Sequence, residues 1–194
     1  MEKLKKFIPW IIVGIVVIWG ISKYNGIVGY DQQTKSAWGD VESDYQRRTD
    51  LIPNLVATVK GYADFEQETL TKVIEARSKA TSVNVDASNL TPDQLAQYQQ
   101  AQDGVSSALG RLMVVVEKYP DLKANQNFLD LQAQLEGTEN RISVSRKRFN
   151  ETVLNYNSAI LGFPGNLIAK IGSFTEKGYF KSAAGAEKAP EVKF

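Results

Sequence analysis

Mostly apolar side chains recur along residues 120–163 at alternating steps of three and four, with one additional step of four near Phe149. Between Pro120 and Gly162 the only helix breaker is Gly137, so this stretch predicts one helix roughly 60 Å long at about 1.5 Å per residue. A stripe this long and narrow needs equally long partners, which predicts a bundle of helices with coiled-coil-like packing. The stripe consists of Phe128, Leu131, Leu135, Thr138, Ile142, Ser145, Phe149, Val153, Tyr156 and Ile160.

The same helical period predicts three further helices, over residues 27–50, 53–80 and 92–119. Asp50 is placed to cap the second of these, with Pro53 in its first turn. A single helix kinked at Pro53 is the alternative, and it changes the helix count by one. Because short connections join antiparallel neighbours, the sequence predicts an all-α fold, in which an N-terminal transmembrane helix precedes an up-and-down antiparallel bundle of the four-helix type.

The N-terminal segment is apolar enough to cross a membrane. Residues 7–22 carry no charge, and the lysines on either side can extend this short run to a full span. Tryptophans lie near both ends, where interfacial aromatic residues gather. A cleaved signal peptide is the alternative, but residues 21–29 contain no small-residue cleavage site, which favours an uncleaved anchor. The candidate anchor residues are Phe7, Trp10, Ile12, Ile15, Ile18, Trp19 and Ile21.

Lysine asymmetry predicts the orientation in the membrane. Three lysines precede the apolar run and only Lys23 follows it closely, so the positive-inside rule places the N-terminus in the cytoplasm and the bundle on the outer side of the membrane. Gly26 and Gly29 permit a hinge at the membrane surface, and one continuous helix is an equal alternative. The predicted regions are a cytoplasmic stub and anchor at 1–26, a helical bundle at 27–163, and a short amphipathic segment with a polar tail at 164–194.

Polar residues gather where both predicted turns meet, at the pole of the bundle far from the membrane. Arg48 falls on an apolar stripe and is expected to pair with Glu117 or Asp121 at the matching level. The group forms either a salt-bridge and capping network that fixes helix register or a docking site, and the structural interpretation is favoured. Its members are Arg47, Arg48, Asp50, Asn54, Glu117, Asp121, Lys123 and Asn125.

A short amphipathic segment follows the Phe163-Pro164-Gly165 break. It lies either in the interface between lipid and water or against the bundle, and docking against the bundle is favoured. Residues 181–194 show no core pattern and predict a polar tail. The residues of the candidate interfacial segment are Leu167, Ile168, Lys170, Ile171 and Phe174.

The amino-acid composition excludes many kinds of catalytic site. The 194 residues contain no cysteine and no histidine, which excludes disulfides, thiol nucleophiles, Ser-His-Asp triads and histidine-containing metal sites. Glu136 and Glu139 are better explained by ion pairing, since di-metal bundles use Glu-x-x-His pairs. A net charge of +1, with basic and acidic residues interspersed, predicts no nucleic-acid partner. No cofactor is expected.

Several segments of the sequence together form a pattern that is specific to one family. They are the apolar run followed by Tyr24-Asn25, the region around Trp38, RRTDLIPNLVATVKGYA at 47–63, the long stretch 109–160, and FPGNLIA at 163–169. In these segments the chain resembles the LemA family of bacterial membrane proteins. The resemblance implies a membrane-anchored up-and-down bundle of long antiparallel helices and brings no catalytic residues with it. Descriptions of the family place the short N-terminus outside the cell, opposite to the orientation that the lysines favour.

The sequence therefore predicts a non-enzymatic, single-pass membrane scaffold. It would present a rigid helical rod to copies of itself, as a homo-oligomer, or to an envelope protein. Membrane remodelling or lipid-surface binding through the anchor and residues 166–180 is the second hypothesis. An enzyme working through carboxylates is a remote third, because no pocket or activated nucleophile is evident.

Overall fold

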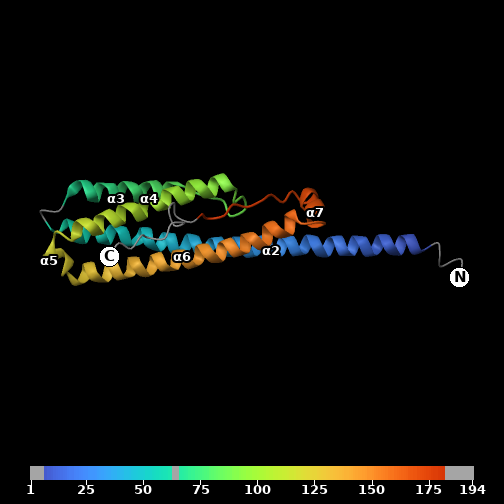
Figure 1. Ribbon diagram of the computed structural model, residues 1–194, viewed down its shortest axis with the longest axis horizontal. Helices are drawn as coiled ribbons and strands as arrows, with labels where there is room; N and C mark the ends of the chain where they lie inside the picture. Colours follow the sequence, from blue (N-terminus) through green and yellow to red (C-terminus); the bar gives the residue numbers. More distant parts are fainter. Residues whose placement is uncertain (1–6, 63–65, 182–194) are drawn as a thin grey trace, which may run out of the picture.

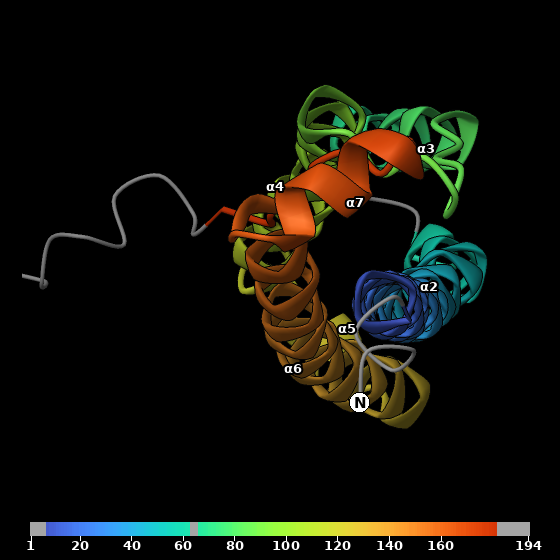
Figure 2. The same cartoon turned by 90° about the vertical axis from the view of Figure 1, so that its right-hand side faces the viewer.

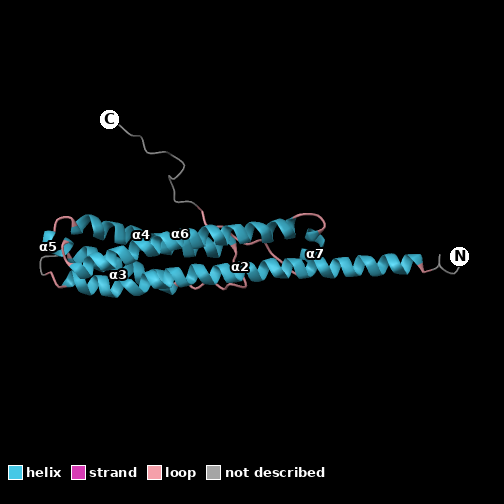
Figure 3. Cartoon of the chain, turned by 90° about the horizontal axis from the view of Figure 1, so that it is seen from below, coloured by secondary structure: helices cyan, strands magenta, loops and turns pink. Residues whose placement is uncertain are grey.

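A long helix carries the apolar N-terminal stretch directly into the body of the protein (Figure 1). The computed structural model describes residues 7–62 and 66–181, so the predicted stub at 1–6 and the predicted tail beyond Lys181 lie outside the described residues. These residues form helices and loops without a strand (Figure 3), which confirms the predicted all-α up-and-down bundle. In chain order the helices are α2 (Ile8–Lys60), α3 (Gln67–Ser82), α4 (Pro92–Val116), α5 (Pro120–Lys123), α6 (Gln126–Leu161) and α7 (Gly165–Ile171).

The stripe predicted on the last long helix is the side of α6 that faces the core. Nine of its ten positions are buried, and Leu131 is partly buried. The predicted single helix from Pro120 is, however, two helices. α5 ends at Lys123, and the side chain of Asn125 then caps α6 by accepting a hydrogen bond from the Phe128 N–H at 3.1 Å. This N-cap starts α6 six residues later than predicted.

The environment of α2 changes at Ile27. Before it the large apolar side chains are exposed, with Trp10 at 74% and Ile18 at 70%, whereas Ile27 is only 3% exposed. Residues 8–26 measure about 28 Å along the axis, close to the thickness of a bilayer's hydrocarbon core. Among the described helices α2 has the length and apolar composition to cross a membrane, and its exposed apolar stretch indicates a membrane anchor. The helix continues through Gly26 and Gly29, so the continuous alternative is the one observed.

Different elements complete the core at the two ends of the bundle. In the half far from the anchor, the α3–α4 hairpin packs on α2 and α6, with Leu55, Val73 and Leu112 among the buried contacts. Nearer the anchor the hairpin ends, and α7 lies across the end of the bundle (Figure 2), where it also contacts α2. There Ile27 and Ile160 pack against the small helix. The segment after α7 then returns along the bundle.

Pro53 does not end the first helix, so the predicted turn at residues 50–53 and the N-cap at Asp50 are wrong. α2 runs on to Lys60, and α3 runs back from Gln67. A proline inside a helix leaves the carbonyl four residues earlier without its N–H partner. Here that carbonyl is Thr49, and Arg77 of α3 donates its Nε–H to it at 2.9 Å. A neighbouring helix therefore supplies the missing hydrogen bond, which explains why α2 tolerates the proline.

Arg77→Ala should lower the free energy of unfolding by about 1–3 kcal/mol, because the buried Thr49 carbonyl loses its partner. Urea unfolding of the full chain in detergent, followed by circular dichroism, measures the change. In a Pro53→Ala background the same substitution should cost less, since the restored backbone N–H can bond to Thr49. Lys79→Ala, on the exposed side of α3, is the matched control. An equal cost of Arg77→Ala in both backgrounds would contradict this explanation.

Candidate functional site

Residues 174–181, here called the C-terminal strap, run without helical structure between α4 and α6. The strap follows the positive-φ residue Ser173 and crosses the start of α4, where the Gly178 N–H donates to the Leu90 carbonyl at 2.9 Å. A Cβ atom at Gly178 would lie 2.7 Å from the Cα of Pro92, so this crossing requires glycine. The strap thus fills the side of the bundle that the α3–α4 hairpin leaves open near the anchor.

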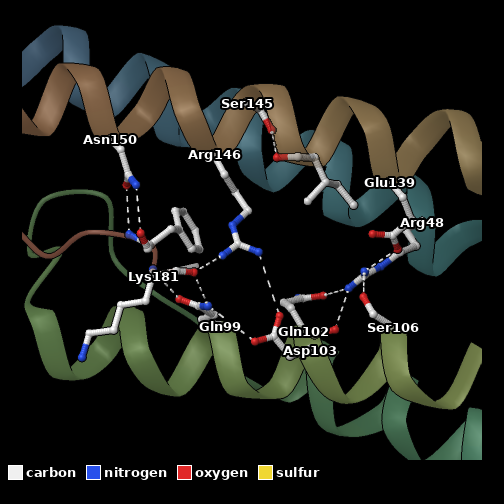
Figure 4. A network of polar contacts seen from close by, with 12 residues as sticks. Arg48, Gln99, Gln102, Asp103, Ser106, Glu139, Ser145, Arg146, Asn150 and Lys181 are labelled. Atoms are coloured by element: carbon white, nitrogen blue, oxygen red, sulfur yellow. Dashed lines mark hydrogen bonds and ion pairs between the residues drawn. The ribbon is translucent and has the colours of Figure 1, made fainter. Parts of the chain in front are cut away.

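Three carboxamide side chains hold the strap by its backbone (Figure 4 shows two of them). Asn157 donates to the Lys177 carbonyl at 2.9 Å and accepts from the Lys177 N–H at 3.0 Å. Asn150 makes the same pair of bonds with Phe180, both at 2.9 Å. Gln99 of α4 does so with Lys181, at 2.9 and 3.0 Å. Each carboxamide thereby bonds to both the N–H and the carbonyl of one strap residue, as the backbone of a neighbouring β-strand would.

The strap also contributes to the core through Phe180, which is 5% exposed. Its ring stacks on Trp38 of α2 with centroids 6.1 Å apart and meets Phe149 of α6 edge-on at 5.5 Å. The Arg146 guanidinium lies 4.8 Å from the Phe180 ring centre and donates to the Lys181 carbonyl at 2.7 Å. Residues from α2, α6 and the strap therefore meet in one aromatic cluster.

Lys177 anchors the strap electrostatically. Its ammonium is 2.9 Å from Asp31 of α2 and 5.0 Å from the centre of the Tyr156 ring. Burial alone would raise the pKa of Asp31, but hydrogen bonds from Lys35 and Lys177 outweigh it and hold that pKa below its usual value. Burial and the Asp31 charge raise the pKa of Tyr156 to about 12. Its neutral hydroxyl donates to the Thr175 carbonyl at 3.0 Å.

Arg48, 1% exposed, joins α2 to α4 and α6 in the middle of the bundle (Figure 4). It donates to Glu139 and to the Ser106 hydroxyl, both at 2.7 Å, and to the backbone and side-chain oxygens of Gln102 at 2.9 and 2.8 Å. The expected partners Glu117 and Asp121 are therefore wrong. Because α2 extends to Lys60, Arg48 lies about 18 Å from the distal end of that helix.

The predicted polar pole is two separate groups. Arg47, Asp50 and Asn54 share α2 with Arg48 and lie on its exposed side, along the length of the bundle. The true distal turn holds the other members: Glu117 pairs with Lys123. There Asn125 donates to the Tyr62 hydroxyl at 3.1 Å, and that hydroxyl donates to the Asp121 carbonyl at 3.4 Å. Misplacing the first turn by about ten residues caused the error.

The candidate interfacial segment has two faces. Ile168 packs on the cluster around Ile27, and the Phe174 ring lies 5.5 Å from that of Tyr24. Leu167 and Ile171 point away from the core, 53% and 85% exposed, and Lys170 is exposed with them. The segment therefore docks on the bundle and still presents apolar side chains outward.

The carboxylates of α6 serve structural contacts. Glu139 pairs with Arg48, as the ion-pair interpretation predicts, and Glu136 accepts from Gln132 at 2.9 Å. Across residues 7–62 and 66–181 no group of three acidic side chains is placed to hold a metal ion. What the arrangement can do chemically is bind an extended backbone and fix helix register.

Asn157→Ala should free the strap, because the Lys177 N–H and carbonyl lose both partners in a buried site. We expect the amides of residues 176–181 to exchange hydrogen for deuterium much faster, and the free energy of unfolding to fall by about 2–4 kcal/mol. Asn155→Ala, on the exposed side of the same helix, is the control. Unchanged exchange in Asn157→Ala would show that the carboxamide does not hold the strap.

Asp31→Asn should destabilise the protein by about 1–3 kcal/mol at neutral pH, because Lys177 loses a charged partner. Since folding lowers the pKa of Asp31, its contribution is complete above the unfolded value of about 3.9 and is lost as the pH falls through the folded value. The difference in unfolding midpoint between the parent and Asp31→Asn should therefore shrink below about pH 4. A difference that stays constant from pH 7 to pH 2 would refute the Asp31 assignment.

Comparisons with known proteins relate this chain to one protein family. A family model described as the LemA family matches residues 37–194. Protein LemA of Metamycoplasma hominis is 26% identical over 158 residues, which are 81% of this chain and 68% of that protein. Magnetosome protein MamQ of Magnetospirillum gryphiswaldense is 26% identical over 179 residues, covering 82% and 65%. Magnetosome protein MamQ 2 of Paramagnetospirillum magneticum is 27% identical over 182 residues, covering 83% and 65%.

The chain thus spans about two thirds of the length of each of these relatives. The matched residues include positions 37–60 of α2, the α3–α4 hairpin, α6, α7 and the strap. With the resemblance of the sequence, the bundle architecture and the family match in agreement, the chain belongs to the LemA family.

Proposed function

We propose that this protein is a non-enzymatic, membrane-anchored scaffold that presents its helical bundle to copies of itself or to an envelope protein. The continuity of α2 is the observation that carries the proposal. Its 53 residues extend over about 80 Å, first through an exposed apolar stretch and then through the bundle core. A helix shared by anchor and bundle joins the bundle to its anchor without a flexible linker, which suits a scaffold.

Two buried charged side chains, Arg48 and Lys177, support this proposal because both are engaged in structural contacts. Arg48 and Glu139 bind each other and α4, while Asp31 and Lys177 hold the strap. These pairs stabilise helix register and strap position instead of facing an enclosed substrate cavity. The proposed role therefore depends on shape and surface rather than on a reactive group.

We further propose that the anchor lies in the bacterial cytoplasmic membrane, crossing it once. The three lysines before the apolar run favour a cytoplasmic N-terminus and an extracytoplasmic bundle. In this orientation the distal turn around Tyr62 and Asn125 is the part of the bundle farthest from the bilayer. Partners in the envelope would meet that end and the outer faces of α4 and α6.

Crosslinking from the outer faces tests the scaffold proposal. A photoreactive amino acid at Val114 of α4 or Val144 of α6, which are 70% and 69% exposed, should disturb folding little. In cells with two differently tagged copies, we expect crosslinked products that carry both tags. Mass photometry of the full chain in mild detergent should show species larger than a monomer.

Crosslinks to one recurring envelope protein, without mixed-tag products, would support docking in place of self-assembly. Cells that carry a single tagged copy provide the control for mixed-tag products. Monomer alone in detergent, together with no crosslinked product from either position, would contradict the scaffold proposal.

A further inference from the structure

The end of the bundle nearest the anchor carries large apolar side chains that do not enter the core. Leu161 is 60% exposed, Phe163 83%, Leu167 53% and Ile171 85%. They belong to the end of α6, the turn that follows it, and α7. In water such a concentration of apolar surface is unfavourable, which calls for a partner that covers it.

The exposure of this surface is built into the fold. The opposite side of α7 is held by Ala169, which is 5% exposed, within the cluster formed by Ile27 and Ile160. Gly165 fits closely against α6, since a Cβ atom there would lie 1.9 Å from the Ala159 carbonyl oxygen. The short helix is therefore fixed on the bundle with its apolar outer side turned away.

The level of α7 along α2 identifies what covers that side. Phe174, just after α7, packs on Tyr24, and Ile27 is the first buried residue of α2. Tyr24 and Ile27 mark the boundary between the exposed apolar stretch of α2 and the bundle. α7 lies across the end of the bundle at this boundary (Figure 2). A bilayer surrounding residues 8–26 would have its surface at the level of α7.

Charge at the same level fits a lipid surface. Lys23 and Lys170 are both exposed there. Lysines beside an apolar face can hold their ammonium groups among lipid phosphates while their stems lie on the hydrocarbon boundary. Apolar residues flanked by lysines are typical of segments that lie in a membrane interface.

We propose that Leu161, Phe163, Leu167 and Ile171 form a membrane foot that inserts into the interface of a phospholipid bilayer beside the anchor. The foot rests on the proposed anchoring by α2 and adds a second contact with the same membrane. Two contacts restrict the tilt and rotation of the bundle, which one helix alone leaves free. The interfacial residues are then Leu167 and Ile171 of the predicted set together with Leu161 and Phe163, while Ile168 and Phe174 attach the foot to the bundle.

Because the chain has no cysteine, single-cysteine labelling of the full protein tests the foot directly. Phe163→Cys and Ile171→Cys are labelled with the fluorophore NBD and reconstituted into vesicles of phosphatidylethanolamine and phosphatidylglycerol. We expect blue-shifted emission and several-fold stronger quenching by shallow nitroxide-labelled lipids than at Val114→Cys, an exposed distal control. Ile15→Cys, in the middle of the anchor, reports on spanning by α2.

The outcomes separate the foot from the anchor. If Ile15→Cys is quenched by lipid but positions 163 and 171 behave like 114, the foot is wrong and the anchor stands. If position 15 also stays in water, the proposed function fails as well. Labels at 163 and 171 that are shielded from aqueous iodide but not quenched by lipid would show a protein partner there, which also overturns the foot.

A charge-insertion variant provides a second measurement. Phe163→Asp combined with Ile171→Asp changes two exposed side chains and should leave folding intact, as circular dichroism can verify. A label at Leu167→Cys should then lose most of its quenching by shallow lipids. Val114→Asp is the matched control and should leave that quenching unchanged. Quenching that persists in the double variant would contradict insertion of the foot.

Discussion

The structure depends on unbroken backbone hydrogen bonding along α2. Inside a bilayer every N–H and carbonyl must be satisfied within the protein, and a helix satisfies them without help. The same helix continues past Ile27 into the bundle, where its apolar side chains change from exposed to core-forming. The one gap in its ladder, opposite Pro53, is closed by Arg77 from α3. Anchor and bundle are consequently one mechanical unit rather than two domains joined by a linker.

Around this helix the bundle is completed in two different ways. Far from the anchor, two further helices cover α2 and α6, and Arg48 ties three of the four together. A buried, multiply bonded arginine of this kind favours one helix register over its neighbours. Nearer the anchor, the strap packs between the start of α4 and α6, with Phe180 supplying apolar volume and Lys177 a charge contact to α2. The strap is therefore part of the fold, not an appendage to it.

The periodic stripes could be predicted from sequence because burial along a helix repeats every three or four residues. Local exceptions could not: Pro53 resembles a helix start until the tertiary contact with Arg77 is known, and the capping role of Asn125 is hidden among other polar residues. The strap was missed for a different reason. An extended segment held by Asn157 leaves no periodic pattern, and an asparagine on a polar helix looks like a solvent-facing residue. The only sign of this role in the sequence is that Asn157 directly follows Tyr156, a residue of the buried stripe.

The central claim is that α2 is a single rigid helix from the membrane into the bundle. Double electron–electron resonance between spin labels at Ile15 and Ser43, both exposed, spans Gly26 and Gly29 within this helix. For a full chain in lipid nanodiscs, 28 helical residues predict one narrow distance distribution centred near about 42 Å. A broad distribution, or one shifted to clearly shorter distances, would reveal a hinge at the membrane surface and contradict the account.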